Sequence, residues 1–273
     1  YTNLNTLSLH DALPISAGTS HSLAVKSDGT VVAWGDRDNY GMTNIPAGLA
    51  DVVAIDAGSE HSIALKSDGT VVSFGWFRFG QKFLPTALGP LVGISTGNNH
   101  TLALKPDGTV IAWGSNSGGQ SNVPVGLSGI VAISAGASHS MALKSDGTVV
   151  AWGVGFYNYA TPPAGLTDVV AISAGEWHSL ALKSDGTVVC WGRNESEQAT
   201  VPAGLKNVVA VSVGHNHTVA LKADGTVVAW GMDTTLAFFS KNLVPYNLTD
   251  VVAISAGQDK TYALKSDGSV VWW

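Results

Sequence analysis

VVAISAGEWHSLALKSDGTVVCWG, residues 169–192, is a unit that recurs with small changes along the whole chain. An Asp-Gly pair lies near its centre, and the same pair begins at Asp28, Asp68, Asp107, Asp146, Asp185, Asp224 and Asp267. Successive pairs are 40, 39, 39, 39, 39 and 43 residues apart. A period of this length is typical of proteins that stack copies of one small structural unit. The chain therefore contains seven copies of one repeat.

Each copy predicts four β-strands. Short runs rich in Val, Ile, Leu and Thr are separated by turn residues, and none of these runs has helical spacing. In the quoted copy we expect strands near residues 169–174, 179–183, 188–192 and 199–202. The proline in the last of these segments suits an edge strand. The Asp-Gly pair predicts a tight hairpin with both residues at positive φ.

The repeats predict an all-β fold, a seven-bladed β-propeller of four-stranded antiparallel blades. A single unit cannot bury its apolar faces, so the copies must pack on one another. The last copy ends at Trp273, after its third strand. We therefore expect an N-terminal strand to complete the last blade and close the ring. A solenoid is the alternative arrangement of the same units.

The first fifteen residues do not follow the repeat. Pro14 falls where the innermost strand of the first copy is expected, and proline breaks a strand ladder. Residues 6–15, TLSLHDALPI, match the conceptual translation of a short-read sequencing adapter. We interpret residues 1–15 as a non-native leader and residues 16–273 as the propeller; the alternative is that the leader still pairs as a strand. If the natural start is missing, a secreted or cell-surface location is favoured.

Composition excludes several classes of function. The net charge is −6, and seven residues of each sign belong to the repeated Lys-x-Asp-Gly unit, so no basic face remains for nucleic acid. Cys190 is the single cysteine, which excludes an internal disulfide and a Cys/His zinc site. No apolar run approaches the roughly 18 residues of a membrane span. We expect no nucleic-acid partner, no membrane span and no cofactor.

One histidine position and one tryptophan position recur in each copy. A ring of histidines could bind metal, but a repeat spreads such residues around a circle, whereas metal ligands converge on one point. We therefore expect the histidines to hydrogen-bond turn backbone and the tryptophans to pack between blades. Lys260 replaces the histidine in the seventh copy, and Phe74 replaces the tryptophan in the second. The residues assigned to these structural roles are His21, His61, His100, His139, His178, His217, Trp34, Trp113, Trp152, Trp191, Trp230 and Trp272.

No catalytic group stands out from the repeat. A Ser-His-Asp triad needs three residues brought together at one place, whereas the serines, histidines and aspartates here recur in every copy. The glycine-rich turns follow hairpins and do not lead into a helix, so they do not predict a phosphate site. We expect a binding module and not an enzyme.

The copies differ most in two segments: the pair of residues before the histidine and the segment after Trp-Gly. In an antiparallel blade both segments lie at the same end, which we call the loop face. Rigid aromatic residues with interspersed arginines are typical of protein-binding hot spots and of surfaces that stack sugars. The alternative is that these side chains fold onto the blade edges or cover the bottom of the ring. The predicted binding residues are Tyr40, Trp76, Phe77, Arg78, Phe79, Phe156, Tyr157, Tyr159, Trp177, Arg193, His215, Phe238 and Phe239.

The unit G-x-x-H-[ST]-x-A-L-K-x-D-G-x-V-x-x-W-G resembles the repeat of the regulator of chromosome condensation family of seven-bladed propellers over residues 16–273. That family includes a nucleotide-exchange factor for a small GTPase, the plant ultraviolet-B photoreceptor and beta-lactamase inhibitory protein II. The chain lacks the basic segments expected of the exchange factor, and only residues 175–179 approach the photoreceptor's G-W-R-H-T units. In chain length and in its W-G and H-x-L-A-L elements, the chain is most similar to the bacterial inhibitor.

These observations favour a monomeric module that recognises a protein, and the resemblance implies inhibition of a secreted enzyme as one form of that role. Lectin-like glycan binding is the alternative, with Trp76, Tyr157 and Trp177 as stacking planes. Guanine-nucleotide exchange and enzyme activity have the least support.

Overall fold

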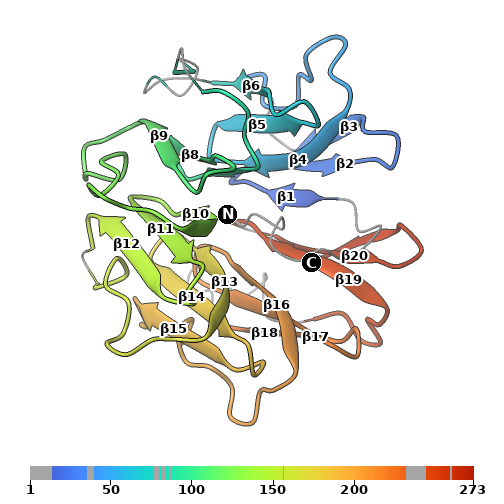
Figure 1. Cartoon of the computed structure of the whole chain (residues 1–273). Coiled ribbons are helices and arrows are strands. Elements are labelled where there is room, and N and C mark those ends of the chain that lie inside the picture. Colours follow the sequence, from blue (N-terminus) through green and yellow to red (C-terminus); the bar gives the residue numbers. More distant parts are fainter. Residues whose placement is uncertain are drawn as a thin grey trace.

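The computed structural model describes residues 14–35, 40–76, 80, 84–85, 88–155, 157–231, 244–258 and 260–273. In this part of the chain each repeat forms one three-stranded antiparallel sheet, and we number the seven sheets in sequence order. The sheets are arranged radially (Figure 1), and the first strand of each sheet contacts the first strand of the next. The strands are β1 (Ile15–Ala17), β2 (His21–Val25), β3 (Val31–Gly35), β4 (Val52–Ala57), β5 (His61–Lys66), β6 (Val71–Gly75), β7 (Gly93–Thr96), β8 (His100–Leu104), β9 (Val110–Gly114), β10 (Ile130–Ala135), β11 (His139–Lys144), β12 (Val149–Gly153), β13 (Val169–Ala174), β14 (His178–Lys183), β15 (Val188–Gly192), β16 (Val208–Val213), β17 (Thr218–Lys222), β18 (Val227–Trp230), β19 (Val251–Ala256), β20 (Thr261–Lys265) and β21 (Val270–Trp272). Within the described ranges, no helix has the length and hydrophobicity needed to cross a bilayer.

The Lys-x-Asp-Gly hairpin joins the second and third strands of each sheet. In the second sheet Lys66 N donates to Thr70 O at 2.8 Å, and Gly69 N donates to Lys66 O at 2.9 Å. Gly69 has a φ of 80°, whereas Asp68 is not at positive φ. The Asp68 carboxylate instead accepts hydrogen bonds from the backbone N–H and the hydroxyl of Thr70. The prediction of two residues at positive φ is therefore wrong, because the loop is a turn followed by a glycine bulge.

The predicted fourth strand is not a strand in the described residues. In the fifth copy residues 199–202 lie outside every ladder, and Leu205 N donates to Pro202 O at 3.1 Å in a turn. Proline removes a ladder donor, and Gly204 has a φ of 76°, so the segment turns instead of extending. Each sheet thus has three strands where we expected four. Residues 1–13, which include most of the leader assigned to ring closure, lie outside the described residues.

The first sheet begins directly after Pro14 and contacts the last sheet. Pro14 precedes β1 and does not interrupt it, and its carbonyl oxygen accepts a hydrogen bond from Val25 N at 3.0 Å. Ala17 N donates to Ser255 Oγ of β19 at 3.0 Å. Ile15 packs in one apolar cluster with Tyr262 of β20. The first and seventh sheets are therefore neighbours.

The hydrophobic core lies between the faces of neighbouring sheets. In one cluster, Met141 and Leu143 of β11 pack against Ile172 of β13 and Trp191 of β15. The second strand also carries a fully buried alanine, Ala142 in this sheet, whose small side chain lets the sheets approach. Truncating one of the large side chains to alanine costs about 2–5 kcal/mol in protein cores. The core thus holds the sheets rigidly at the positions from which the loops extend.

Serine and glycine set the spacing of neighbouring first strands. Ser95 Oγ of β7 accepts a hydrogen bond from Ala135 N of β10 at 3.0 Å, and equivalent bonds occur at the other junctions. The glycine after each first strand faces the next sheet at close range, and a Cβ on Gly97 would overlap the carbonyl oxygen of Gly136. The Ser-Ala-Gly sequence of the repeat is therefore a requirement of the inter-sheet contact.

Candidate functional site

The two variable segments of each repeat lie side by side, as the sequence predicts. A backbone N–H after the third strand donates to the carbonyl of the residue that precedes the histidine. The bonds are Trp76 N to Glu60 O at 2.7 Å, Ser115 N to Asn99 O at 2.8 Å, Val154 N to Ser138 O at 3.2 Å and Arg193 N to Trp177 O at 2.9 Å. Both segments therefore belong to the loop face in the second to fifth sheets.

Seven of the predicted binding residues lie in described parts of the chain. Tyr40, Trp76 and Tyr157 are exposed, with 41%, 39% and 47% of their surface accessible. Trp177, Arg193 and His215 are partly buried. Tyr159 is fully buried. The remaining predicted residues, Phe77, Arg78, Phe79, Phe156, Phe238 and Phe239, lie outside the described residues.

Side chains from neighbouring repeats orient the exposed aromatic residues. Tyr40, from the loop after the first sheet, meets the Trp76 ring edge-on, with ring centres 3.8 Å apart and an interplanar angle of 77°. The Arg193 guanidinium lies 5.6 Å from the centre of the Tyr157 ring. Edge-to-face contacts and cation–π contacts both restrict ring orientation. The loop face thus carries two small groups of oriented aromatic side chains.

Tyr159 belongs to the framework and not to the exposed surface, so its assignment to the binding face is wrong. Its ring lies between His139, at 4.7 Å, and Trp177, at 6.4 Å between ring centres. Its carbonyl oxygen accepts hydrogen bonds from Ser179 Oγ at 2.8 Å and Trp191 Nε1 at 2.9 Å. The segment after the fourth sheet therefore folds onto the fifth sheet, which buries the tyrosine.

A contact that the sequence did not reveal joins the fifth and sixth sheets on the loop face. The Glu176 carboxylate forms a hydrogen bond with His215 Nδ1, and both side chains are partly buried. The two residues are 39 positions apart and occupy the same place in successive repeats. The contact could have been predicted from this equivalence, because residues at matching positions in adjacent repeats become neighbours.

Each repeated histidine bonds to the next sheet, and not to turn backbone as expected. In every case Nε2 lies within hydrogen-bond distance of a Ser or Thr hydroxyl. The pairs are His21–Ser62 at 2.7 Å, His61–Thr101 at 3.2 Å, His100–Ser140 at 2.9 Å, His139–Ser179 at 2.8 Å, His178–Thr218 at 2.8 Å and His217–Thr261 at 2.8 Å. No group of three potential metal-binding side chains occurs among the described residues.

The hydrogen bonds fix the protonation state of these histidines. Ser179 donates its single hydroxyl proton to Tyr159 O, so it must accept a hydrogen bond from His139, whose Nε2 carries the proton. Burial lowers the pKa of His139 to about 3, because a charged imidazole would lose its hydration. Burial lowers the pKa of His61, His100 and His178 to about 3 as well. These four histidines are therefore neutral at physiological pH, and His139 acts as a structural donor.

The repeated tryptophans pack between sheets, with one change of assignment. Trp152 Nε1 donates to Gln120 O at 2.9 Å, so this ring also anchors the segment after the third sheet. In the last sheet Tyr262 pairs with Trp272, which is 60% exposed, and Thr261 exchanges backbone hydrogen bonds with Trp273. Trp273 therefore occupies the framework position that we had assigned to Trp272. The sequence contained this signal, because Trp273 is six residues after its Asp-Gly aspartate, as in the other copies.

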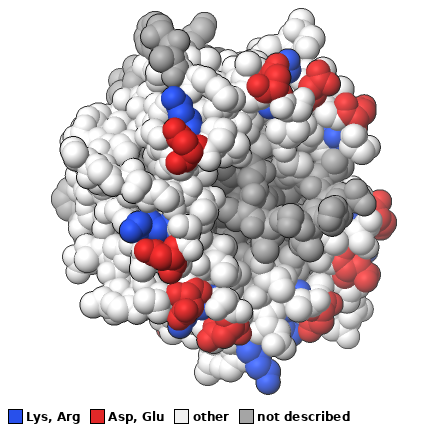
Figure 2. All heavy atoms as spheres, viewed as in Figure 1, with Lys and Arg blue, Asp and Glu red and all other residues white. Residues whose placement is uncertain are grey.

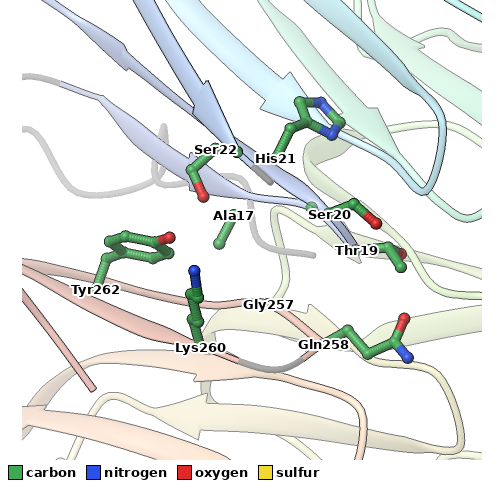
Figure 3. A pocket seen from close by; sticks show the side chains of 11 residues that line it. Ala17, Thr19, Ser20, His21, Ser22, Gly257, Gln258, Lys260 and Tyr262 are labelled. Carbon is green, nitrogen blue, oxygen red and sulfur yellow. The ribbon is translucent and has the colours of Figure 1, made fainter. Parts of the chain in front are cut away.

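The junction between the last and first sheets differs from the other six. Lys260 stands at the histidine position, and a cavity of about 440 Å³ opens beside it. Figure 3 shows Lys260 projecting from the last sheet toward the first, with Ser22 and Tyr262 nearby. Lys260 Nζ lies 5.0 Å from the centre of the Trp272 ring. The sequence showed only that Lys260 departs from the repeat, and it did not predict the cavity.

Basic and acidic residues are interspersed on the face seen in Figure 2. Lys and Arg side chains lie beside Asp and Glu near its margin, and its described residues form no extended basic area. Pairs within the hairpins include Lys66 with Asp68 at 3.5 Å and Lys222 with Asp224 at 2.8 Å. Such exposed pairs contribute little stability. They neutralise the lysines that a polyanion would otherwise contact.

Comparison with known proteins identifies the repeat. The model of the regulator of chromosome condensation (RCC1) repeat matches more than half of the chain, at residues 15–41, 52–81, 91–120, 130–158, 169–198 and 208–234. A search of curated protein sequences gave no significant match.

Solved structures of low sequence identity share the fold. Prp20p from Saccharomyces cerevisiae has a TM-score of 0.75 at 20% identity, over 91% of this chain and 81% of that chain. The CRINKLY ectodomain of the Arabidopsis thaliana receptor kinase ACR4 has a TM-score of 0.75 at 20% identity, over 96% of both chains. Human WBSCR16 has a TM-score of 0.74 at 16% identity, over 95% of this chain and 89% of that chain. The fold is that of RCC1-like β-propellers, and the chain belongs to the regulator of chromosome condensation (RCC1) repeat family.

Proposed function

We propose that the protein is a non-catalytic binding module that recognises a protein partner through its loop face. The observation that carries this proposal is the exposure of Tyr40, Trp76 and Tyr157, each between 39% and 47% accessible, in contact with side chains of neighbouring repeats. Oriented aromatic side chains supply a large contact area and dominate many protein interfaces. Partly buried Trp177 and Arg193 extend this surface.

The framework beneath the loop face supports the proposal, because it reduces the entropy that binding would cost. Backbone hydrogen bonds tie Trp76 to Glu60 and Arg193 to Trp177 in the same sheet. Carbonyls of the loop segments, such as Gln120 O, also accept hydrogen bonds from the next sheet. Loops held in this way lose little conformational freedom when a partner docks.

The distribution of charge favours a protein over a nucleic acid. The net charge is −6, and the hairpin lysines lie beside aspartates. Binding to nucleic acid draws on unpaired Lys and Arg that neutralise phosphates. We expect no binding to duplex DNA at physiological salt.

We also infer that the propeller ring is closed and that residues before β1 add a strand to the outer edge of the last sheet, beside β21. The hydrogen bond from Ala17 to Ser255 and the packing of Ile15 near Tyr262 support this inference, because they bring the start of the chain to the last sheet. Deleting residues 1–13 should then raise amide hydrogen exchange in β21 (Val270–Trp272) and leave β12 (Val149–Gly153) unchanged. Equal exchange in β21 before and after the deletion would contradict this.

The binding proposal is tested by quantitative affinity capture with matched variants. The immobilised baits are the unmodified protein, the triple variant Trp76→Ala/Tyr157→Ala/Trp177→Ala, and the control Tyr246→Ala. Tyr246 is 94% exposed and lies in the segment that leads to β19, away from the loop face. A partner retained by the protein and the control, and reduced at least about tenfold by the triple variant, supports the proposal. A partner retained equally by all three contradicts it.

Glycan binding is the second candidate, because an exposed tyrosine or tryptophan ring also suits stacking on a sugar. The 47% exposure of Tyr157 favours it. A glycan array with the same three proteins separates the candidates: saturable binding of a glycan that is lost in the triple variant supports the lectin role.

The likeness in scale to beta-lactamase inhibitory protein II extends the protein-binding proposal to inhibition. A captured secreted enzyme whose activity falls on addition of the protein would support inhibition.

A further inference from the structure

We propose that the cavity between the first and last sheets binds a small organic carboxylate, with Lys260 as the residue that recognises its charge. The cavity measures about 440 Å³ and is lined by Thr19, Ser22, Gln258, Lys260 and Tyr262, among others. This volume lies in the range of small-molecule sites. The site uses none of the exposed aromatic residues of the proposed function, so it stands independently of that function.

Comparison with the other six junctions shows how the cavity arises. At each of them an imidazole reaches a hydroxyl of the next sheet, as His139 reaches Ser179 at 2.8 Å, and the His139 ring also packs against Gly136. Ser22 is the equivalent hydroxyl of the first sheet, and Lys260 stands where the imidazole would be. A lysine side chain is narrower than an imidazole and carries its polar group farther from the backbone. The replacement opens the junction and places a cation in it.

Three substitutions on the last sheet lie at this cavity or beside it: Lys260 and Tyr262 line it, and Trp272 lies next to Lys260. Lys260 replaces histidine, Tyr262 replaces the aliphatic residue found there in the other sheets, and Trp272 replaces a small residue such as Ala151 or Cys190. Tyr262 and Trp272 are directly paired across β20 and β21, and Lys260 Nζ lies 5.0 Å from the Trp272 ring centre. Figure 3 shows Lys260 and Tyr262 projecting from one sheet toward Ser22 on the other. The departures from the repeat are therefore grouped at this junction, and two of the three substituted residues line the cavity.

The chemistry of the lining favours a carboxylate. Lysine offers three N–H donors, serine and tyrosine hydroxyls can donate as well, and charge-assisted hydrogen bonds are the strong ones. Lys260 is the single Lys or Arg among the described lining residues, which matches one negative charge better than the two of a phosphate. Trp34 meets the Tyr262 ring edge-on at 5.7 Å between ring centres, so apolar surface adjoins the polar groups. An aromatic acid such as benzoate has one negative charge to match Lys260 and an apolar ring to match the adjoining apolar surface.

The test measures the affinity of the full chain for benzoate, with benzamide, inorganic phosphate and a glutamate-containing peptide as matched probes. Saturation-transfer NMR and Trp fluorescence report binding directly. The expected result is saturable binding of benzoate and at least about tenfold weaker binding of benzamide, since benzamide lacks the charge. Absence of benzoate binding, equal affinity for benzamide, or tighter binding of phosphate or of the peptide would each overturn the proposal.

Two variants of Lys260 separate recognition from folding. Lys260→Met removes the charge at similar length and should weaken benzoate binding at least about tenfold. Lys260→His restores the residue of the other six repeats, should keep or raise the thermal unfolding temperature, and should abolish binding. Lys206→Met, at an exposed lysine outside the cavity, is the control that should bind as the unmodified protein does. Unchanged binding in Lys260→Met or Lys260→His, or a loss in Lys206→Met, would contradict the assignment.

Discussion

Asp56 stands where the first strands of the other six sheets carry a serine. Those serines are Ser16, Ser95, Ser134, Ser173, Ser212 and Ser255. The Asp56 carboxylate is fully buried and accepts hydrogen bonds from Ser16 Oγ and Thr96 N, each at 2.7 Å. Burial raises the pKa of Asp56 to about 6, because these bonds replace its hydration only in part. The aspartate therefore preserves the inter-sheet hydrogen bond at an energetic cost when it is ionised.

Replacing this carboxyl with the serine of the other repeats should stabilise the protein at neutral and alkaline pH. The pKa of Asp56 is higher in the folded state than its ordinary value of 3.8, so its contribution to stability is present below about pH 4 and is lost as the pH rises through 6. Asp56→Ser should therefore raise the free energy of unfolding by about 1 kcal/mol more at pH 8 than at pH 5, where the protein is still folded. Urea unfolding at the two pH values measures this. An equal effect at both would refute the explanation.

The two tryptophans at the end of the chain should differ in their effect on stability. Trp273 packs against the apolar cluster between the sixth and seventh sheets, whereas Trp272 is 60% exposed. We expect Trp273→Ala to lower the free energy of unfolding by about 2 kcal/mol, and Trp272→Ala to change it by about 0.5 kcal/mol or less. Thermal and urea denaturation compare the two variants. A larger loss in the free energy of unfolding for Trp272→Ala than for Trp273→Ala would contradict the assignment of Trp273 to the framework position.

At the scale of the elements, the contact that organises the fold is the junction between sheets. A histidine of one sheet donates to a hydroxyl of the next, and that hydroxyl donates to a loop carbonyl, as in His139, Ser179 and Tyr159. One small cluster thus joins two sheets and a segment of the loop face. Any residue that disrupts a junction should affect both stability and the position of the loops.

Removal of one junction histidine should therefore destabilise the protein. His139→Ala deletes the bond to Ser179 and the ring that packs against Gly136 and Tyr159, which should cost about 3 kcal/mol in the free energy of unfolding. The control is His215→Ala on the loop face, where the side chain is partly exposed and the cost should stay near 1 kcal/mol or below. Similar losses in both variants, measured by urea unfolding, would argue against a special role for the junction.

The sequence predicts what is shared among the copies better than what is unique to one. Strands such as Val169–Ala174 and His178–Lys183 follow from turn residues and β-forming runs that occur in every copy. The burial of Tyr159 could not be predicted in this way, because it depends on a segment folding across to the next sheet. The bonding of His139 to Ser179 also depends on the distance between sheets, which no single repeat specifies.

The candidate site was predictable in place but not in detail. Antiparallel pairing places both variable segments at one end, and the bond from Arg193 N to Trp177 O confirms this. The contact of Arg193 with Tyr157 joins loops of different sheets, so it depends on side-chain orientations that periodicity does not determine. The cavity at Lys260 required knowledge of what the histidine does in the other copies.

At the scale of the whole molecule, neutral buried histidines should make the protein sensitive to acid. The pKa values of His61, His100, His139 and His178 are lowered from 6.5 to about 3 in the folded state, so the unfolded chain binds more protons between these pH values. Stability is fully present above about pH 6.5 and falls as the pH decreases. Four such groups together should remove about 5 kcal/mol of stability for each pH unit below 6.

The expected outcome is cooperative unfolding with a midpoint between about pH 4 and 5, followed by circular dichroism and Trp fluorescence. A variant with one junction histidine replaced by glutamine, such as His100→Gln, should show a shallower dependence of stability on pH. A protein that stays folded at pH 3.5, or a slope that His100→Gln leaves unchanged, would show that these histidines do not control acid stability.

Recognition through the loop face is tested most directly by the dissociation constant of a captured protein partner. Surface plasmon resonance should compare Trp76→Ala/Tyr157→Ala with Tyr246→Ala, since all three positions are exposed aromatic residues but Tyr246 lies away from the loop face. We expect the dissociation constant to rise at least about tenfold for the double variant and to stay within about twofold for Tyr246→Ala. Equal affinity of the double variant and the unmodified protein would contradict recognition through this face.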